Sequence, residues 1–398
     1  MLNIKTGLIL GGKKLMETKK TTNKFNSNAI IGVLAFSAFL AVFNETILNV
    51  ALSPLMTEMN VTAGTVQWII TAYMIVVSVM VPITAFLIQT FETKHLFLGA
   101  MTLLLVGTIC AACSGSFAML LVSRMLQASG TGMMIPLLMN TVLIVTPPEK
   151  HGAAMGICGC VISIGPALGP TVSGILLQFF SWHVLFILLI PLILIAMILG
   201  SIYLVNVSTL TNPKMDFISI ILSSLGIGGV IYGISSFSGD GNMKIISLIF
   251  IVGIISLILF VKRQLSLKEP MLEMRIFKYP LFSVGVVLVM LTMMTMFTMN
   301  VMLPMFLQGA LKTTTFVAAM VLLPASLACG VVTPIGGKIY DKFGVKVLIP
   351  VGFTIILVAL FVLSRSNSDT SLIRIMVSYI VVCIEIGRAS CRERVFAG

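Results

Sequence analysis

The chain has 398 residues, of which 58% are hydrophobic and only 10% are charged, and its formal net charge is +12. Ordinary soluble domains contain about 25% charged residues. A folded soluble chain could not bury so much apolar surface, so the composition excludes a soluble globular protein. It predicts a protein whose main solvent is the lipid bilayer.

Apolar runs of about 20 residues, the length that crosses the hydrocarbon core of a bilayer, recur along the whole chain. They predict an all-α polytopic membrane protein with about twelve membrane-spanning helices joined by short connections. The predicted helices are 29–53, 65–90, 95–113, 117–145, 151–178, 184–205, 217–238, 243–262, 281–308, 316–338, 346–364 and 371–387.

Lysine and arginine are distributed unequally between alternate connections. Most of them fall on the side of the basic segment 1–28, and only Lys244, Lys312, Arg365 and Arg374 fall on the other side. Because cytoplasmic loops carry the excess of basic residues, we expect a multi-pass protein of the cytoplasmic membrane with its N-terminus in the cytoplasm. The positive charge is then a signal of topology and indicates no nucleic-acid partner.

An internal repeat suggests how the helices are grouped. The stretch from Pro82 to Lys94 matches the stretch from Pro334 to Lys346 at Pro, Ile, Phe and Lys, which relates the second predicted helix to the tenth. Two bundles related by an axis along the membrane normal are a known plan of transporters. The predicted divisions are a cytoplasmic segment 1–28, a six-helix bundle 29–205, an inserted helix pair and loop 206–280, an incomplete C-terminal bundle 281–387 and a non-native tail 388–398.

The predicted fifth helix has an unusual composition between Gly152 and Gly174, with six glycines and two prolines. Gly165 and Gly169 have the spacing that lets two helix backbones approach closely in a membrane. Pro166 and Pro170 lie on one face and are expected to bend the helix. A glycine-rich packing helix without any further role is the alternative interpretation.

Two charged residues fall within predicted membrane spans, where charges are costly and are candidates for function. Glu45 in the first helix and Arg124 in the fourth are predicted at similar depth, which would allow them to pair. Asn49 at i+4 from Glu45 and Gln127 at i+3 from Arg124 are expected on the same helix faces. A carboxylate near a buried cation could carry a proton. Alternatively, Arg124 extends to the interface and Glu45 is a protonated structural acid.

Motifs of soluble catalysis are missing from the sequence. There is no phosphate-binding loop, zinc-protease motif or Ser–His–Asp set, so neither an enzyme nor a cofactor or metal is predicted. The predicted helix 281–308 is rich in methionine, including Met290, Met299 and Met302. Flexible thioethers can adapt to dissimilar apolar ligands, although core or lipid-facing filler explains them as well.

Four stretches together resemble the major facilitator superfamily, and within it the 14-helix drug:proton antiporter branch. The residues that carry the resemblance are Gly165, Pro166, Gly169, Pro170 and Gly174 for the antiporter motif of the fifth helix, Arg124 and Gln127 for the motif of the fourth helix, Gly337, Asp341, Gly344 and Lys346 for the inner-loop gating motif, and Asn44 to Leu52 for the first-helix signature. The run FNETILNVAL is most similar to lincomycin-exporter-like proteins of Gram-positive bacteria.

The resemblance implies the major facilitator fold, with about 12 of an expected 14 transmembrane helices present. It implies a proton-coupled secondary transporter that exports drugs or other amphiphilic small molecules by alternating access, as a monomer in the membrane. Glu45 and Arg124 would couple the proton, and Asn44, Asn49 and Gln127 would line the substrate cavity. In the signature an aspartate usually stands where this chain has Asn44. Two other interpretations are a facilitator or symporter for a metabolite, and a truncated remnant without transport.

Overall fold

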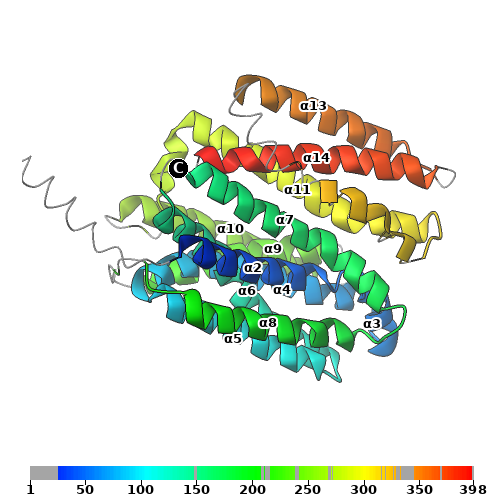
Figure 1. The fold of residues 1–398 in the computed structure, drawn as a ribbon, viewed down its shortest axis with the longest axis horizontal. Helices are drawn as coiled ribbons and strands as arrows, with labels where there is room; N and C mark the ends of the chain where they lie inside the picture. The colour runs from blue at the N-terminus through cyan, green and yellow to red at the C-terminus, as the bar shows by residue number, and fades with distance from the viewer. Residues whose placement is uncertain are drawn as a thin grey trace, which may run out of the picture.

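The computed structural model shows a protein built of long helices that run side by side (Figure 1). It describes residues 26–147, 150–207, 210, 216–237, 242–267, 270, 272–314, 316–318, 320–325, 327–328, 332, 345–367 and 370–396. Nine helices in these ranges are long and apolar enough to cross a membrane. They lie where the hydropathy of the sequence predicts spans.

The first half of the chain forms a bundle of six long helices and one short helix. The helices are α2 (Ser27–Thr46), α3 (Leu52–Glu58), α4 (Ala63–Thr90), α5 (Thr93–Ala112), α6 (Phe117–Val145), α7 (His151–Leu176) and α8 (His183–Tyr203). Polar side chains begin several of them, because the first N–H groups of a helix lack partners within it. Asn26, Thr62 and Ser116 each accept a hydrogen bond from the backbone N–H three residues later.

The predicted helix 29–53 is in fact interrupted. Its helical part ends at Thr46, and α3 begins at Leu52 after a turn held by bonds from Asn49 N–H to the Thr46 carbonyl and from Ala51 N–H to the Leu48 carbonyl. Pro54 lies in the first turn of α3, where its missing N–H needs no partner within the helix, so it favours the start of a new helix at this point. Asn49 therefore does not lie one regular helical turn beyond Glu45, and the prediction of a shared helix face is wrong.

Within the bundle, α2 packs against α6, α7 and α8, while α6 also packs against α4 and α5. The helix pair α9 (Phe217–Ser236) and α10 (Met243–Ser266) packs together and contacts the bundle through α4. Most of its large apolar side chains are exposed, as expected for helices that face lipid. At one end of the pair, Arg263 donates from Nε and a terminal nitrogen to both carboxylate oxygens of Asp216 at 2.8 Å.

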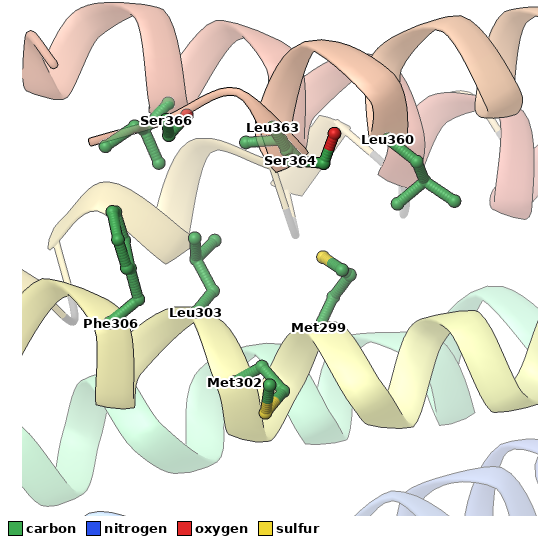
Figure 2. A pocket seen from close by; sticks show the side chains of 9 residues that line it. Met299, Met302, Leu303, Phe306, Leu360, Leu363, Ser364 and Ser366 are labelled. Atoms are coloured by element: carbon green, nitrogen blue, oxygen red, sulfur yellow. The ribbon is translucent and has the colours of Figure 1, made fainter.

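The last part of the chain contains η3 (Met274–Lys278), α11 (Pro280–Gly309), α13 (Val345–Ser364) and α14 (Leu372–Phe396), and the residues 316–318 and 320–325 are also helical. A cavity of about 330 Å³ lies between α11, α13 and α14 (Figure 2). Met299 and Met302 contribute to its wall, whereas Met290 and Met294 are exposed on the outside of α11. The methionines of α11 therefore lie partly in the wall of the cavity and partly on the outer surface.

The helix α14 continues beyond the predicted end at residue 387. The apolar run stops there, but alanine, arginine and glutamate are good helix formers, so the end of the hydropathic segment is not the end of the helix. α14 also packs against α7, which places the last helix beside the glycine-rich fifth span (Figure 1). The division at residue 388 stays a prediction.

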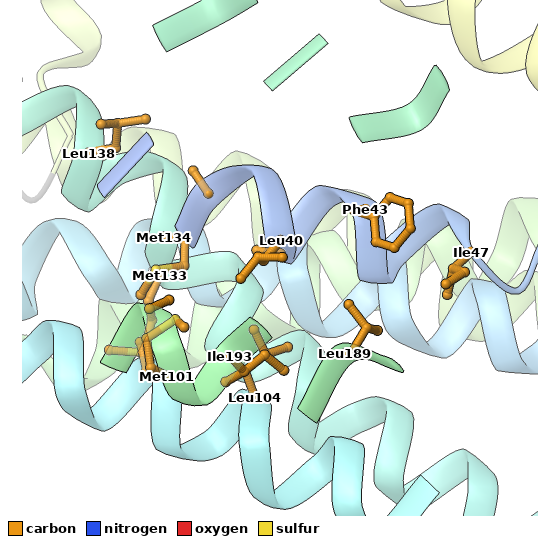
Figure 3. Packing of buried hydrophobic residues seen from close by; sticks show 14 of the residues in the cluster. Leu40, Phe43, Ile47, Met101, Leu104, Met133, Met134, Leu138, Leu189 and Ile193 are labelled. Atoms are coloured by element: carbon orange, nitrogen blue, oxygen red, sulfur yellow. The ribbon is translucent and has the colours of Figure 1, made fainter. Parts of the chain in front are cut away.

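The largest hydrophobic core lies inside the first bundle. Leu40, Phe43 and Ile47 from the chain around α2 meet Met101 and Leu104 of α5 and residues of α6 and α8 (Figure 3). Smaller clusters lie among α11, α13, α14 and the residues 318–325. The first bundle therefore has the packing that can hold a polar site rigidly in place.

Candidate functional site

Arg124 is the centre of the candidate site. It lies on α6 and is fully buried, with 0% of its side chain surface exposed. One terminal nitrogen donates to the backbone oxygen of Asn44 at 3.0 Å, and the other donates to the backbone oxygen of Glu45 at 3.2 Å. Since a buried cation is costly unless it is well hydrogen-bonded, this arrangement accounts for how the membrane interior tolerates it.

The two carbonyl groups are available because α2 ends directly after them. The last four carbonyls of a helix have no N–H partner within it, and the turn after Thr46 directs its own N–H groups elsewhere. The C-terminal end of a helix also carries a partial negative charge that favours a cation. The break at Thr46 thus creates the binding place for the guanidinium group of Arg124, which caps the end of α2.

A second set of hydrogen bonds fixes Arg124 from α5 and α6. Its guanidinium donates to Oε1 of Gln127 at 2.9 Å, and Nε2 of Gln127 donates to the hydroxyl of Thr108 at 3.0 Å. Gly107 makes this possible, because a Cβ there would lie 2.7 Å from the Cγ of Gln127. The predicted association of Gln127 with Arg124 is present, and both the oxygen and the nitrogen of the Gln127 amide form hydrogen bonds in this network.

Tyr73 of α4 closes the site from a third side. The guanidinium carbon of Arg124 lies 4.1 Å from the centre of the Tyr73 ring, within the range of a cation–π contact. The phenolic hydroxyl donates to the hydroxyl of Thr131 on α6 at 2.7 Å. The sequence analysis missed Tyr73, Thr108 and Thr131, because hydroxyl groups in apolar helices commonly bond within their own helix and no spacing marks these three.

Glu45 and Arg124 are neighbours, but their contact differs from the predicted one. Arg124 reaches the backbone oxygen of Glu45, and the ion pairs found among the described residues do not include these two side chains. Glu45 is partly exposed. The side chain of Asn44 is fully buried, and neither its Oδ1 nor its Nδ2 has a hydrogen-bond partner.

The motif of α7 packs against α2. A Cβ on Gly165 would lie 3.1–3.2 Å from Val42 and Phe43, and one on Gly169 would collide with Thr46. Thr46 also donates from its hydroxyl toward the Gly165 carbonyl at 3.5 Å. Gly165 and Gly169 therefore face a helix of the same bundle, while α7 also contacts α14 of the C-terminal part.

The other residues of the α7 motif are also inside the protein. Pro166 and Pro170 lie within the helix, and both they and Gly174 are buried. Toward their N-terminal ends α2 and α7 separate, and a cavity of about 780 Å³ opens between them and the end of α6. Apolar side chains that include Phe36, Phe39 and Ile157 line most of it.

Polar groups gather at one end of this α2–α7 cavity, where Asn28, Thr146 and Lys150 contribute to its wall. Its size is typical of sites for drug-sized ligands. Its lining is made by other residues than the predicted Asn44, Asn49 and Gln127, whose role at a substrate stays a prediction.

Two further predictions concern the ends of helices. Of the gating motif, Gly337, Asp341 and Gly344 lie outside the described residues, and Lys346 falls in the first turn of α13. Both tryptophans, Trp68 and Trp182, are expected near the outer ends of spans, where an aromatic belt lies. Trp182 is buried at the beginning of α8 and donates from Nε1 to the carboxylate of Glu58 at 2.8 Å.

Packed membrane-spanning helices that enclose a buried cation and a drug-sized apolar cavity are typical of multi-pass membrane transporters. The family model of the Major Facilitator Superfamily matches residues 34–391. The chain belongs to this superfamily. The predicted family and fold class are thereby confirmed.

Relatives support the same assignment. The chain is 41% identical to the lincomycin resistance protein LmrB of Bacillus subtilis over 354 residues, which covers 88% of this chain and 74% of that protein. It is 41% identical to the lincomycin resistance protein LmrB of Listeria monocytogenes, covering 90% of this chain and 76% of that protein. The crystal structure of the peptide transporter POT in complex with sulfate has the same fold, with a TM-score of 0.64, 18% identity, and coverage of 91% and 80% of the two chains.

Proposed function

We propose that the protein exports amphiphilic drugs across the cytoplasmic membrane in exchange for protons, by alternating access of its two halves. The observation that carries this proposal is the capping of α2 by the buried Arg124 directly beside Glu45. The names of the relatives at 41% identity point to drug resistance, and lincomycin is therefore the first substrate to test.

The proton would be carried by the carboxyl group of Glu45. Its neighbour Arg124 is a fixed positive charge in a place without water, and such a charge stabilises a nearby carboxylate. Because Glu45 is one residue from the end of α2, a small movement of that end would change both its distance from Arg124 and its access to water. Deprotonation near the cation and protonation away from it would then accompany opposite movements of α2.

The substrate would bind in the cavity between α2 and α7. Its apolar and aromatic wall suits the apolar part of an amphiphile, and the polar end near Asn28, Thr146 and Lys150 suits the hydrated part. Thr46, which contacts Gly165 and Gly169, lies at the same end of α2 as Glu45. A ligand that separates α2 from α7 would therefore act on the segment that carries the proton site.

The orientation in the membrane follows from the distribution of charge. The side rich in lysine and arginine would face the cytoplasm, which places the N-terminus and the polar end of the cavity there. We propose a monomer in the cytoplasmic membrane of a Gram-positive bacterium, since the relatives named above come from Bacillus and Listeria. Drug would then enter the cavity from the cytoplasm or from the inner leaflet.

The test is transport in inverted vesicles from a drug-sensitive host that expresses the full 398-residue chain. An imposed pH gradient, acidic inside, should drive lincomycin uptake, and added drug should release protons. Glu45→Gln should reduce both about 100-fold, the usual contribution of a group that transfers a proton. Glu92→Gln is the matched control, because Glu92 lies at the beginning of α5 and contacts His95 at an exposed site.

Two results would contradict the proposal. Drug uptake that continues at the same rate after the pH gradient is collapsed would remove proton coupling. Equal uptake by the wild type and Glu45→Gln would remove Glu45 from the mechanism. Without any drug transport, two other results would favour the alternatives: release of preloaded small metabolites together with protons would favour a symporter, and metabolite uptake that does not depend on the pH gradient would favour a facilitator.

A further inference from the structure

Tyr73 is the one aromatic side chain in contact with the guanidinium group of Arg124 among the described residues. It belongs to α4, whereas the hydrogen-bond partners of Arg124 belong to α2 and α6. Only 1% of Tyr73 is exposed. We infer that Tyr73 is a positioning residue for Arg124, which holds the guanidinium over the end of α2 and so sets the efficiency of coupling; this rests on the proposed function.

The hydrogen bonds of Arg124 do not involve every nitrogen of its guanidinium group. Both terminal nitrogens have acceptors, but Nε is buried and has no partner. The hydrogen bonds therefore hold the guanidinium at its terminal nitrogens only. The ring of Tyr73, 4.1 Å from the guanidinium carbon, adds a contact through its negative π-face.

The ring itself is held by α6. Its hydroxyl donates to Thr131 at 2.7 Å, and Thr131 stands seven residues after Arg124, two turns further along the same helix. Arg124 therefore contacts the ring of Tyr73, and Thr131 contacts its hydroxyl group. This double contact ties α4 to the face of α6 that carries the cation, so the three helices α2, α4 and α6 meet at one point.

Tyr73 acts through Arg124 and does not line the α2–α7 cavity. Its removal should therefore change the rate of the proton-coupled step and leave drug binding intact. Tyr73→Phe keeps the ring and loses only the bond to Thr131. Tyr73→Leu removes the ring and with it the contact that restricts the guanidinium.

The experiment measures lincomycin uptake driven by a pH gradient, at varied drug concentration, for the full chain in inverted vesicles. Tyr73→Leu should lower the maximal rate about 10-fold, a loss within the range of a desolvated cation–π contact. The half-saturating drug concentration should stay within about 2-fold. Tyr73→Phe should restore at least half of the wild-type rate.

The matched control is Tyr232→Leu, which removes a tyrosine ring packed on α4 at a distance from Arg124. Tyr232 of α9 lies 5.3 Å from Trp68, measured between ring centres. Its loss tests whether any tyrosine at α4 affects transport through stability alone. The inference is overturned if Tyr73→Leu and Tyr232→Leu have the same rates, or if Tyr73→Leu raises the half-saturating concentration as much as it lowers the rate.

Arg124→Gln and Glu45→Gln run in parallel separate the two ideas. If both keep gradient-driven uptake, the proposed coupling itself is wrong. If both lose uptake while Tyr73→Leu keeps the wild-type rate, only the positioning role is wrong. The amount of folded protein, measured by size-exclusion chromatography of each variant in detergent, serves to normalise the rates.

Discussion

The first bundle and the last helices of this protein each bury one charged side chain among the described residues, and they do so differently. Arg124 in the first bundle is held by two helix-end carbonyls, a glutamine and a tyrosine ring. Glu385 on α14 lies against α13, where its Oε2 is 3.1 Å from the place a Cβ on Gly352 would occupy. A large core surrounds the first charge, and smaller clusters adjoin the second.

This difference teaches how a membrane protein can keep a functional charge. Lipid offers no hydrogen bonds, so a polar network must be complete within the protein. In the first bundle, glycine contacts between helices and the break in α2 bring acceptors to both terminal nitrogens of Arg124. Under the proposed function, the movement that couples transport would take place at the end of α2, while the rest of the bundle stays packed.

The largest expected effect concerns the close contact of α7 with α2. Gly169→Leu would place a side chain into Thr46 and should destabilise the protein by about 3 kcal/mol or more, the upper range of overpacking. Gly285→Leu on α11 meets no atom within 4 Å and should leave the stability unchanged or slightly higher. The thermal unfolding temperature in detergent measures both. Equal losses for the two variants would remove the special status of the α2–α7 contact.

A somewhat smaller effect is expected for two arginines of the described residues that lie over aromatic rings. Arg124→Gln leaves the Asn44 and Glu45 carbonyls without their donor and should cost about 2–3 kcal/mol. Arg365 lies 5.1 Å from the centre of the Phe361 ring at an exposed site, and Arg365→Gln should cost about 0.5 kcal/mol. Thermal unfolding of both variants provides the measurement. A larger loss for Arg365→Gln would show that the second half depends on its charges as strongly as the first.

Trp182→Phe tests how much the hydrogen bond between Trp182 and Glu58 stabilises one end of the first bundle. The indole N–H that donates to Glu58 is lost while most of the ring packing remains, so we expect a loss of about 1–2 kcal/mol. Glu58→Gln keeps an acceptor for the indole and is the control, with a smaller expected loss. If both variants unfold like the wild type, the short helix α3 is not held by this bond.

A small effect is also expected outside both halves, at the inserted pair. The hydrogen bonds from Arg263 lower the pKa of Asp216 from 3.8 to about 2. A lowered pKa means that the stabilisation is complete above the ordinary value and is lost only as the pH falls through about 2. Asp216→Asn should therefore cost about 0.5–1 kcal/mol, equally at pH 5.5 and pH 7.5. A cost that differs between these two pH values would contradict the lowered pKa.

Much of the fold was accessible from hydropathy, because a span needs about 20 apolar residues wherever it packs. The spans around Arg124 and the glycines of α7 fell at their predicted places. Helix ends were less accessible. No residue at Thr46 itself marks the break, since Pro54 indicates only the start of the next helix, and α14 continues past the apolar run because charged helix formers follow it.

The candidate site was accessible only in part. Arg124 and Glu45 stand out in apolar sequence, and Gln127 follows from helical spacing. Tyr73, Thr108 and Thr131 belong to three different stretches or faces, and no local pattern joins them. Their association requires the distances between α4, α5 and α6, which depend on how small residues such as Gly107 allow the helices to approach.

The sequence by itself determined that this protein is an all-α membrane protein, which residues are charged within its spans, and which family its motifs resemble. These properties depend on composition and on one-dimensional spacing, which the bilayer converts directly into helices. Only the tertiary structure decided that Arg124 binds the backbone end of α2 rather than the Glu45 carboxylate, and that Gly165 and Gly169 face α2. The reason is that a backbone carbonyl becomes an acceptor only where a helix ends, and a glycine selects its neighbour only when the helices meet.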